Sequence, residues 1–95
     1  MKQVGIIGGA GYTAGELIRI LLNHKEVAIK YIFSTSNAGN KVSAVHQDLV
    51  GDTDLIFSGN INTNVDVLFL CLGHGNSKDF LVKTAISSST KVIDL

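Results

Sequence analysis

The sequence predicts an α/β fold in which strands and helices alternate around a parallel sheet. Three observations support this prediction: an apolar run at residues 4–7 stops at a cluster of glycines, an amphipathic segment follows at 16–23, and residues 67–72 are six consecutive apolar side chains. An unbroken run of this kind is typical of a strand buried on both faces, as in the centre of a parallel sheet. We therefore expect parallel strands joined by right-handed crossovers.

The remaining elements follow from periodicity and composition. The helix expected at 16–23 should be largely buried, because Leu17, Ile20 and Leu21 share one face and Ile18 and Leu22 widen it. Residues 27–33 are rich in β-branched and aromatic side chains and should form a second strand. The polar stretch after it should be a loop with a short helical turn. Further expected elements are strands at 55–57, 66–72 and 91–95, and a helix at about 77–87.

Size, charge and cysteine content limit the possible functions. A chain of 95 residues is one domain at most, spanning residues 1–95. Eight basic and eight acidic side chains cancel, which argues against nucleic acid or an anionic membrane as a partner. The apolar runs are shorter than the roughly 18 residues of a membrane span. A single cysteine excludes an internal disulfide framework, so we expect a cytoplasmic protein.

The glycine-rich turn after the first strand predicts a dinucleotide site. Its spacing is Gly8-x-x-Gly11-x-x-x-Gly15. A strand-to-helix turn without bulky side chains lets backbone amides and the positive helix end approach a diphosphate. Glu16 stands where a P-loop would have lysine, which favours a dinucleotide over a nucleoside triphosphate. The alternative is that the glycines only allow close helix packing. The expected contacts in a Rossmann-type sheet are Gly8, Gly9, Ala10, Gly11, Tyr12 and Thr13.

The loop after the second strand favours NADP over NAD. An NAD site usually carries an acidic residue there, which binds the ribose 2′-hydroxyl. This sequence has Ser34, Thr35 and Ser36 instead, and Lys41 lies nearby in the sequence. Hydroxyl groups can donate to a 2′-phosphate, and no carboxylate is present to repel it. We therefore expect these three residues to bind NADP, although a plain polar loop is the alternative.

Taken together, these motifs resemble the start of N-acetyl-γ-glutamyl-phosphate reductase. The similarity covers nearly the whole chain in the expected order, through residues 4–17, 36–39, 72–75 and 91–95. The string Gly-Tyr-Thr-x-x-Glu-Leu at 11–17 is its most discriminating part. The glycines alone would also suit another semialdehyde dehydrogenase, such as the aspartate type.

The resemblance implies the NADPH-dependent reduction of N-acetylglutamyl phosphate to N-acetylglutamate semialdehyde, in arginine biosynthesis, by a full-length homo-oligomer. In this family the catalytic cysteine and histidine belong to the part of the sequence after residue 95. We therefore expect residues 1–95 to be a fragment that has no catalytic residues and is inactive by itself. The alternative is that the chain ends naturally at residue 95, on an edge strand. A nucleotide-sensing domain without activity is the alternative function.

The single cysteine and the three histidines are expected to have different roles. Cys71 lies inside an apolar run and is expected to be structural, since a nucleophile needs an activated, accessible thiol. The resemblance implies coenzyme contacts after the central strand, at Leu72, Gly73 and His74. His24 should lie at a helix end, and His46 should be a surface residue. No pair of these residues has the spacing of a metal site, so none is expected.

Overall fold

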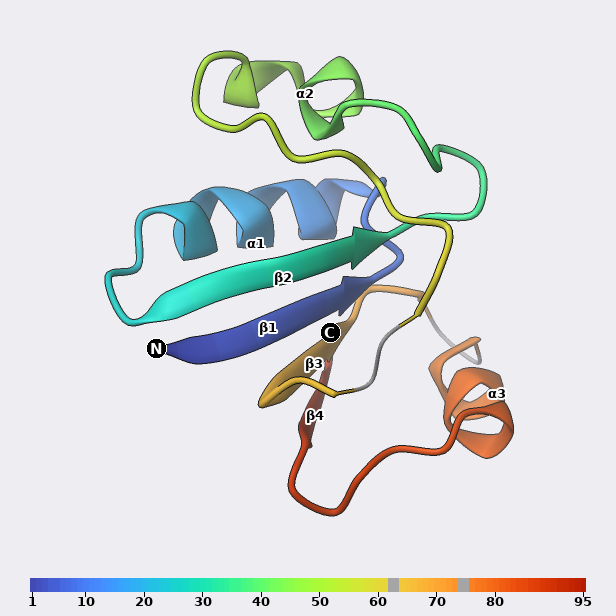
Figure 1. The fold of residues 1–95 in the computed structure, drawn as a ribbon. Helices are drawn as coiled ribbons and strands as arrows, with labels where there is room; N and C mark the ends of the chain where they lie inside the picture. Colours follow the sequence, from blue (N-terminus) through green and yellow to red (C-terminus); the bar gives the residue numbers. More distant parts are fainter. Residues whose placement is uncertain (62–63, 74–75) are drawn as a thin grey trace.

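The computed structural model describes residues 1–61, 64–73 and 76–95, and its centre is a four-stranded parallel sheet (Figure 1). The strands are β1 (Lys2–Ile7), β2 (Val27–Phe33), β3 (Val67–Leu70) and β4 (Lys91–Asp94). Their order across the sheet is β2-β1-β3-β4, so the chain reverses its direction of winding between β1 and β3. The expected α/β fold with a parallel sheet is confirmed.

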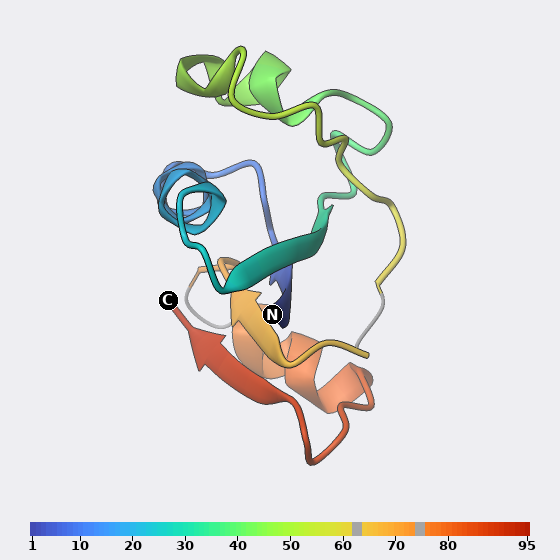
Figure 2. The same cartoon turned by 60° about the vertical axis from the view of Figure 1, so that its left-hand side comes forward.

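Helices cover both faces of this sheet. Helix α1 (Tyr12–Leu22) lies on one face, and the short helix α2 (Val42–Val45) with the 3-10 turn η1 (Gln47–Leu49) lies beyond it on the same side (Figures 1 and 2). Helix α3 (Asn76–Lys83) covers the other face. No helix in the described part of the chain is long and apolar enough to cross a membrane.

Each face of the sheet has its own apolar cluster. The cluster beneath α1 and α2 consists of Val4, Ile6, Ala14, Ile18, Leu21, Ile32, Val42, Leu49 and Phe57. The cluster on the α3 side consists of Ile7, Val65, Leu68 and Leu70. Strand β3 contributes to both, because Leu68 and Leu70 are fully buried on one face while Val67 and Phe69 pack against the cluster on the other. The strand is therefore buried on one face and partly buried on the other, so the expected burial on both faces holds only in part.

The register brings three carboxyl ends to one edge of the sheet. Ile7 at the end of β1 pairs with Phe33 at the end of β2 and with Leu70 at the end of β3. The loops that leave these strands therefore begin side by side. A glycine turn follows β1, a hydroxyl-rich loop follows β2, and Cys71 and Leu72 follow β3.

Helix α1 starts earlier than the apolar pattern predicts, and its buried face agrees with the expected one only at Ile18 and Leu21. It begins at Tyr12 rather than 16, and its buried residues are Ala14, Gly15, Ile18 and Leu21. Ile20 is 57% exposed, so its expected burial is wrong. The small residues Ala14 and Gly15 let the helix approach its neighbours closely, and this contact sets which face turns inward.

Other expected boundaries also shift. Residues 55–57 do not form a named strand; the segment makes one antiparallel bridge between Ile56 and Lys41, and Ser58 makes a parallel bridge to Phe33. Strand β3 ends at Leu70 rather than 72, and α3 ends at Lys83 rather than 87. The strand expected at 55–57 is therefore wrong. This segment forms hydrogen bonds with residues 40–42 instead of extending the sheet.

The first position of the turn, Gly8, requires glycine for both a conformational and a steric reason. Gly8 has φ +84°, and a Cβ there would lie 2.6 Å from the carbonyl oxygen of Cys71. We predict that Gly8→Ala lowers the free energy of unfolding by about 2 kcal/mol or more, through backbone strain and overpacking. Urea denaturation measures the loss. Gly39→Ala is the matched control, because Gly39 has φ +88° but open space around it. Equal losses in the two variants would contradict the steric part of this account.

Candidate functional site

The carboxyl edge of the sheet contains a hollow of about 280 Å³, here called the carboxyl-edge hollow. It lies at the ends of β1 and β3, between which the strand order reverses. Open α/β sheets bind their ligands at this kind of switch point. The lining residues are Gly8, Ala10, Gly11, Phe33, Ser34, Thr35, Ser36, Cys71 and Leu72.

Most of the residues expected to bind a coenzyme meet at this hollow. Those that line it are Gly8, Ala10, Gly11, Ser34, Thr35, Ser36 and Leu72. Gly9 is buried behind the turn, while Tyr12 and Thr13 are exposed in the first turn of α1. Gly73 follows Leu72 with φ +85°, and His74 lies outside the described residues.

Two of the turn amides are already paired within the protein. The N–H groups of Gly8 and Gly9 both donate to the carbonyl oxygen of Phe33, at 3.1 Å and 2.9 Å. A Cβ on Gly9 would overlap Ile32. These glycines therefore shape the turn and attach it to β2, and their amides are not available to a diphosphate.

The amides that follow them are available. Within the described ranges, no acceptor is found for the backbone N–H groups of residues 10–14, and the helical bonds begin with Gly15 donating to the Gly11 carbonyl at 3.0 Å. The first turn of α1 contains no acidic side chain that would neutralise the positive helix end. Free amides at a helix start attract anions. This part of the hollow suits a phosphate group.

Gly11 is the glycine that packing within the chain does not explain. It is the N-cap of α1 with φ −79° and ψ 169°, a conformation open to any residue. A Cβ built on it would have no atom within 4 Å. The bare backbone at this position leaves room for another molecule to come close to the turn amides.

The loop after β2 brings hydroxyl groups to the same hollow. Ser34 is buried, its N–H donates to the Ser58 carbonyl at 3.0 Å, and its Oγ accepts from the Asn37 N–H at 3.3 Å. No acceptor for the Ser34 hydroxyl hydrogen is found within the described ranges, so this hydroxyl can donate to a ligand. Thr35 and Ser36 are exposed at the rim. None of the described lining residues carries a carboxylate, and Lys41 is not among them.

Cys71 lines the hollow without the environment of a nucleophile. It is half-buried and packs against the cluster beneath α1. Burial raises the pKa of the Cys71 thiol, and the nearby Asp94 carboxylate raises it further. A raised pKa favours the neutral thiol, whereas a nucleophile needs the thiolate.

The expectation that His46 lies on the surface is wrong. Its side chain is only 8% exposed, and its Nε2 lies 2.6 Å from the Gly9 carbonyl oxygen. The polar residues around it in the sequence gave no sign of this burial. In the folded chain Gly15 makes room for this ring, because a Cβ there would lie 2.5 Å from Nδ1 of His46. His24 is exposed beyond the end of α1, as expected, and its Nδ1 accepts from the Glu26 N–H.

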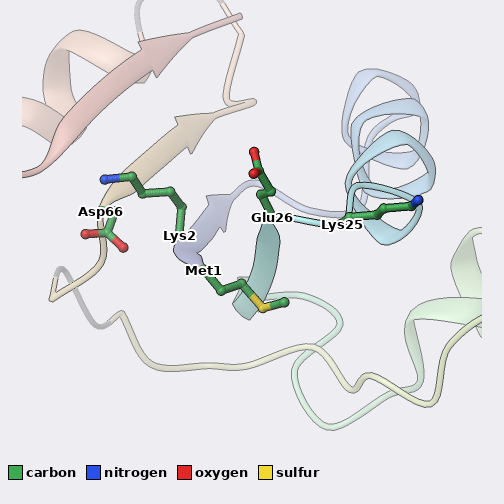
Figure 3. A pocket seen from close by; sticks show the side chains of 5 residues that line it. All are labelled: Met1, Lys2, Lys25, Glu26 and Asp66. Carbon is green, nitrogen blue, oxygen red and sulfur yellow. The ribbon is translucent and has the colours of Figure 1, made fainter.

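A larger hollow of about 630 Å³ lies at the opposite, amino edge of the sheet (Figure 3). Its lining residues are Met1, Lys2, Lys25, Glu26 and Asp66. Figure 3 shows that these side chains spread apart instead of converging on one point. Asp66 already accepts the Gln3 N–H at 2.7 Å. This hollow has neither a glycine turn nor free helix amides, so the carboxyl-edge hollow is the better candidate.

The sequence has named relatives that match it along its whole length. The chain is 58% identical to N-acetyl-gamma-glutamyl-phosphate reductase of Christiangramia forsetii and 57% identical to that of Flavobacterium johnsoniae, over all 95 residues. It spans about 30% of the length of these relatives. The resemblance seen in the motifs is confirmed.

Fold and family agree with the sequence relatives. The solved structure of aspartate semialdehyde dehydrogenase with NADP from Candida albicans matches 99% of this chain and 29% of its own, with a TM-score of 0.74 at 20% identity, which confirms the Rossmann-type fold. Residues 3–95 match the profile described as semialdehyde dehydrogenase, NAD binding domain. The chain therefore belongs to the family of semialdehyde dehydrogenase NAD-binding domains, whose coenzyme is a nicotinamide dinucleotide.

Proposed function

We propose that this chain is the NADP-binding part of an N-acetyl-γ-glutamyl-phosphate reductase. The observation that carries the proposal is the row of free amides at residues 10–14, beside a hollow at the switch point of the sheet. Sequence relatives with 50–58% identity bear this enzyme's name, which favours it over the aspartate-type dehydrogenase, matched at 20%. The full-length enzyme would reduce N-acetylglutamyl phosphate to N-acetylglutamate semialdehyde in the cytoplasm, as a homo-oligomer.

The two ends of the coenzyme would meet different parts of the hollow. The amides of Ala10, Gly11, Tyr12 and Thr13 would hold the diphosphate against the positive start of α1. The hydroxyl groups of Ser34, Thr35 and Ser36 would donate to the 2′-phosphate. Leu72 and Gly73 would lie towards the nicotinamide half of the coenzyme, which supplies the hydride when bound. The resemblance implies a coenzyme contact for His74 as well, which lies outside the described residues.

The proposed division of roles leaves binding and orientation to this chain. Cys71 is not assigned a nucleophilic attack, because burial and the Asp94 carboxylate raise the pKa of its thiol, which favours the neutral form. Reduction of an acyl phosphate would require the catalytic groups that the resemblance locates after residue 95. A chain limited to residues 1–95 is therefore expected to show no turnover with NADPH.

The hydroxyl-rich loop predicts a coenzyme preference. NADP should bind more tightly than NAD in calorimetric titration of the full-length protein. Ser36→Asp should weaken NADP binding by about tenfold or more, roughly 1.4 kcal/mol, because the new carboxylate repels the 2′-phosphate. Ser88→Asp is the control, since Ser88 is an exposed serine that does not line the hollow. Tighter binding of NAD by the unmodified protein would refute the proposed role of this loop.

The open space at Gly11 predicts a variant that folds but binds poorly. Gly11→Ala should change the free energy of unfolding by less than about 1 kcal/mol, the range of an N-cap substitution. The same variant should weaken NADP binding about tenfold or more, because the methyl group would occupy space needed by the diphosphate. Titration calorimetry and urea denaturation measure the two effects. Gly51→Ala is the control, because Gly51 does not line the hollow, and it should leave the affinity for NADP unchanged. If Gly11→Ala also leaves the affinity for NADP unchanged, the proposed site is wrong.

The raised pKa of Cys71 predicts slow alkylation at neutral pH. Because the pKa of the thiol is raised, half-ionisation of Cys71 should be reached at a pH above the ordinary cysteine pKa of about 8.5. The rate of iodoacetamide labelling of this cysteine can be measured by mass spectrometry from pH 6 to 10. It should therefore increase at a higher pH than the rate of labelling of glutathione. Cys71→Ala should keep turnover of the full-length enzyme within about threefold. Rapid labelling at pH 7, with loss of turnover in Cys71→Ala, would identify Cys71 as a nucleophile.

A further inference from the structure

The Gly9–Ala10 peptide is held by a side chain from a distant part of the sequence. The carbonyl oxygen of Gly9 lies 2.6 Å from Nε2 of His46, 37 residues further along the chain. A carbonyl oxygen can only accept a hydrogen bond, so Nε2 of His46 carries the hydrogen and donates it. The N–H of Gly9 itself donates to Phe33. The backbone at Gly9 is therefore fixed through both its N–H and its carbonyl group.

His46 is itself held firmly. It lies between α2 and η1, where its N–H donates to the Val42 carbonyl and its carbonyl accepts from the Leu49 N–H, each at 2.9 Å. Val42 and Leu49 are fully buried in the cluster beneath this segment. The ring of Phe57 packs beside the imidazole, with centroids 6.2 Å apart and a tilt of 57°. The donor is thus on a rigid support rather than on a free side chain.

The imidazole also explains the third glycine of the turn motif. A Cβ on Gly15 would lie 2.5 Å from Nδ1 of His46, so glycine at this position lets the ring lie against α1. Figure 1 shows the α2 segment above α1, on the same side of the sheet. Gly15 therefore serves the contact with His46 and not the ligand hollow, which it does not line.

Fixing the Gly9 carbonyl also fixes the direction of the next amide. The peptide group is planar, and in the trans form its C=O and N–H point to opposite sides. No cis peptide is found among the described residues. The Ala10 N–H therefore points away from His46, and Ala10 lines the carboxyl-edge hollow. A hydrogen bond accepted at the carbonyl also polarises the N–H of the same peptide and strengthens it as a donor.

We propose that His46 is a positioning residue of the coenzyme site. Its Nε2–H holds the Gly9–Ala10 peptide so that the Ala10 amide faces the coenzyme diphosphate. The inference rests on the proposed coenzyme site and adds a residue to it from outside the glycine motif. His46 would not touch the coenzyme, because it lies behind the turn and does not line the hollow.

The test compares two substitutions in the full-length protein. His46→Leu keeps an apolar side chain in the buried space but removes the donor, whereas His46→Gln keeps an N–H near the position of Nε2. We expect His46→Leu to raise the Kd for NADP and the KM for NADPH about tenfold, with kcat within twofold. We expect His46→Gln to stay within threefold of the unmodified protein. Unchanged affinity in His46→Leu would overturn the proposal.

A stability control separates positioning from general damage. Leu68→Ala removes packing from the cluster on the opposite face of the sheet, away from His46, and it should destabilise the protein while leaving the Kd for NADP within twofold. All variants are measured at a temperature at which each is fully folded. A loss of affinity in Leu68→Ala as large as in His46→Leu would overturn the positioning role.

One further measurement does not depend on coenzyme binding. Nitrogen-15 relaxation of the coenzyme-free protein reports the mobility of the Ala10 and Gly11 amides. In His46→Leu their order parameters should fall from about 0.85 to below about 0.6, and His46→Gln should restore them. Unchanged order parameters would refute the role of His46. Failure of the unmodified protein to bind either NADP or NAD would refute the proposed function instead.

Discussion

One carbonyl oxygen, that of Phe33, fixes the bend on which the site depends. It accepts the N–H groups of both Gly8 and Gly9 and so ties the exit of β1 to the end of β2. On its other side, the bend lies against the Cys71 carbonyl at the end of β3. The turn is thus held between β2 and β3, and helix α1 begins directly after it. The amides of the first helical turn are then left without acceptors within the described chain.

The glycines of the motif divide between two tasks. Gly8, Gly9 and Gly15 each have close neighbours within the protein that leave no room for a side chain. For these three, the simple explanation of close packing holds. Gly11 differs, because a side chain there would meet open space and its backbone angles need no glycine. Gly11 and the free amides, rather than the number of glycines, therefore indicate a ligand site.

The sequence predicted the parts of the site that depend on local patterns. Two apolar runs identified β1 and β3, and parallel pairing then brought the glycine turn and Ser34 to one edge. The start of α1 was missed because small residues, which the apolar pattern ignores, form its inner face. His46 was missed for a different reason: its partner Gly9 lies 37 residues away, and only the folded chain brings them together.

The central claim is that the amides at the start of α1 hold the diphosphate of the coenzyme. The most direct test is a titration of the nitrogen-15-labelled full-length protein with NADP, followed through individual backbone amides. The account predicts large proton shifts for Ala10, Gly11 and Tyr12, and small ones for Gly8 and Gly9, whose hydrogens already bind Phe33. Shifts centred instead on Lys2 and Asp66 at the amino edge, with the turn unaffected, would contradict it.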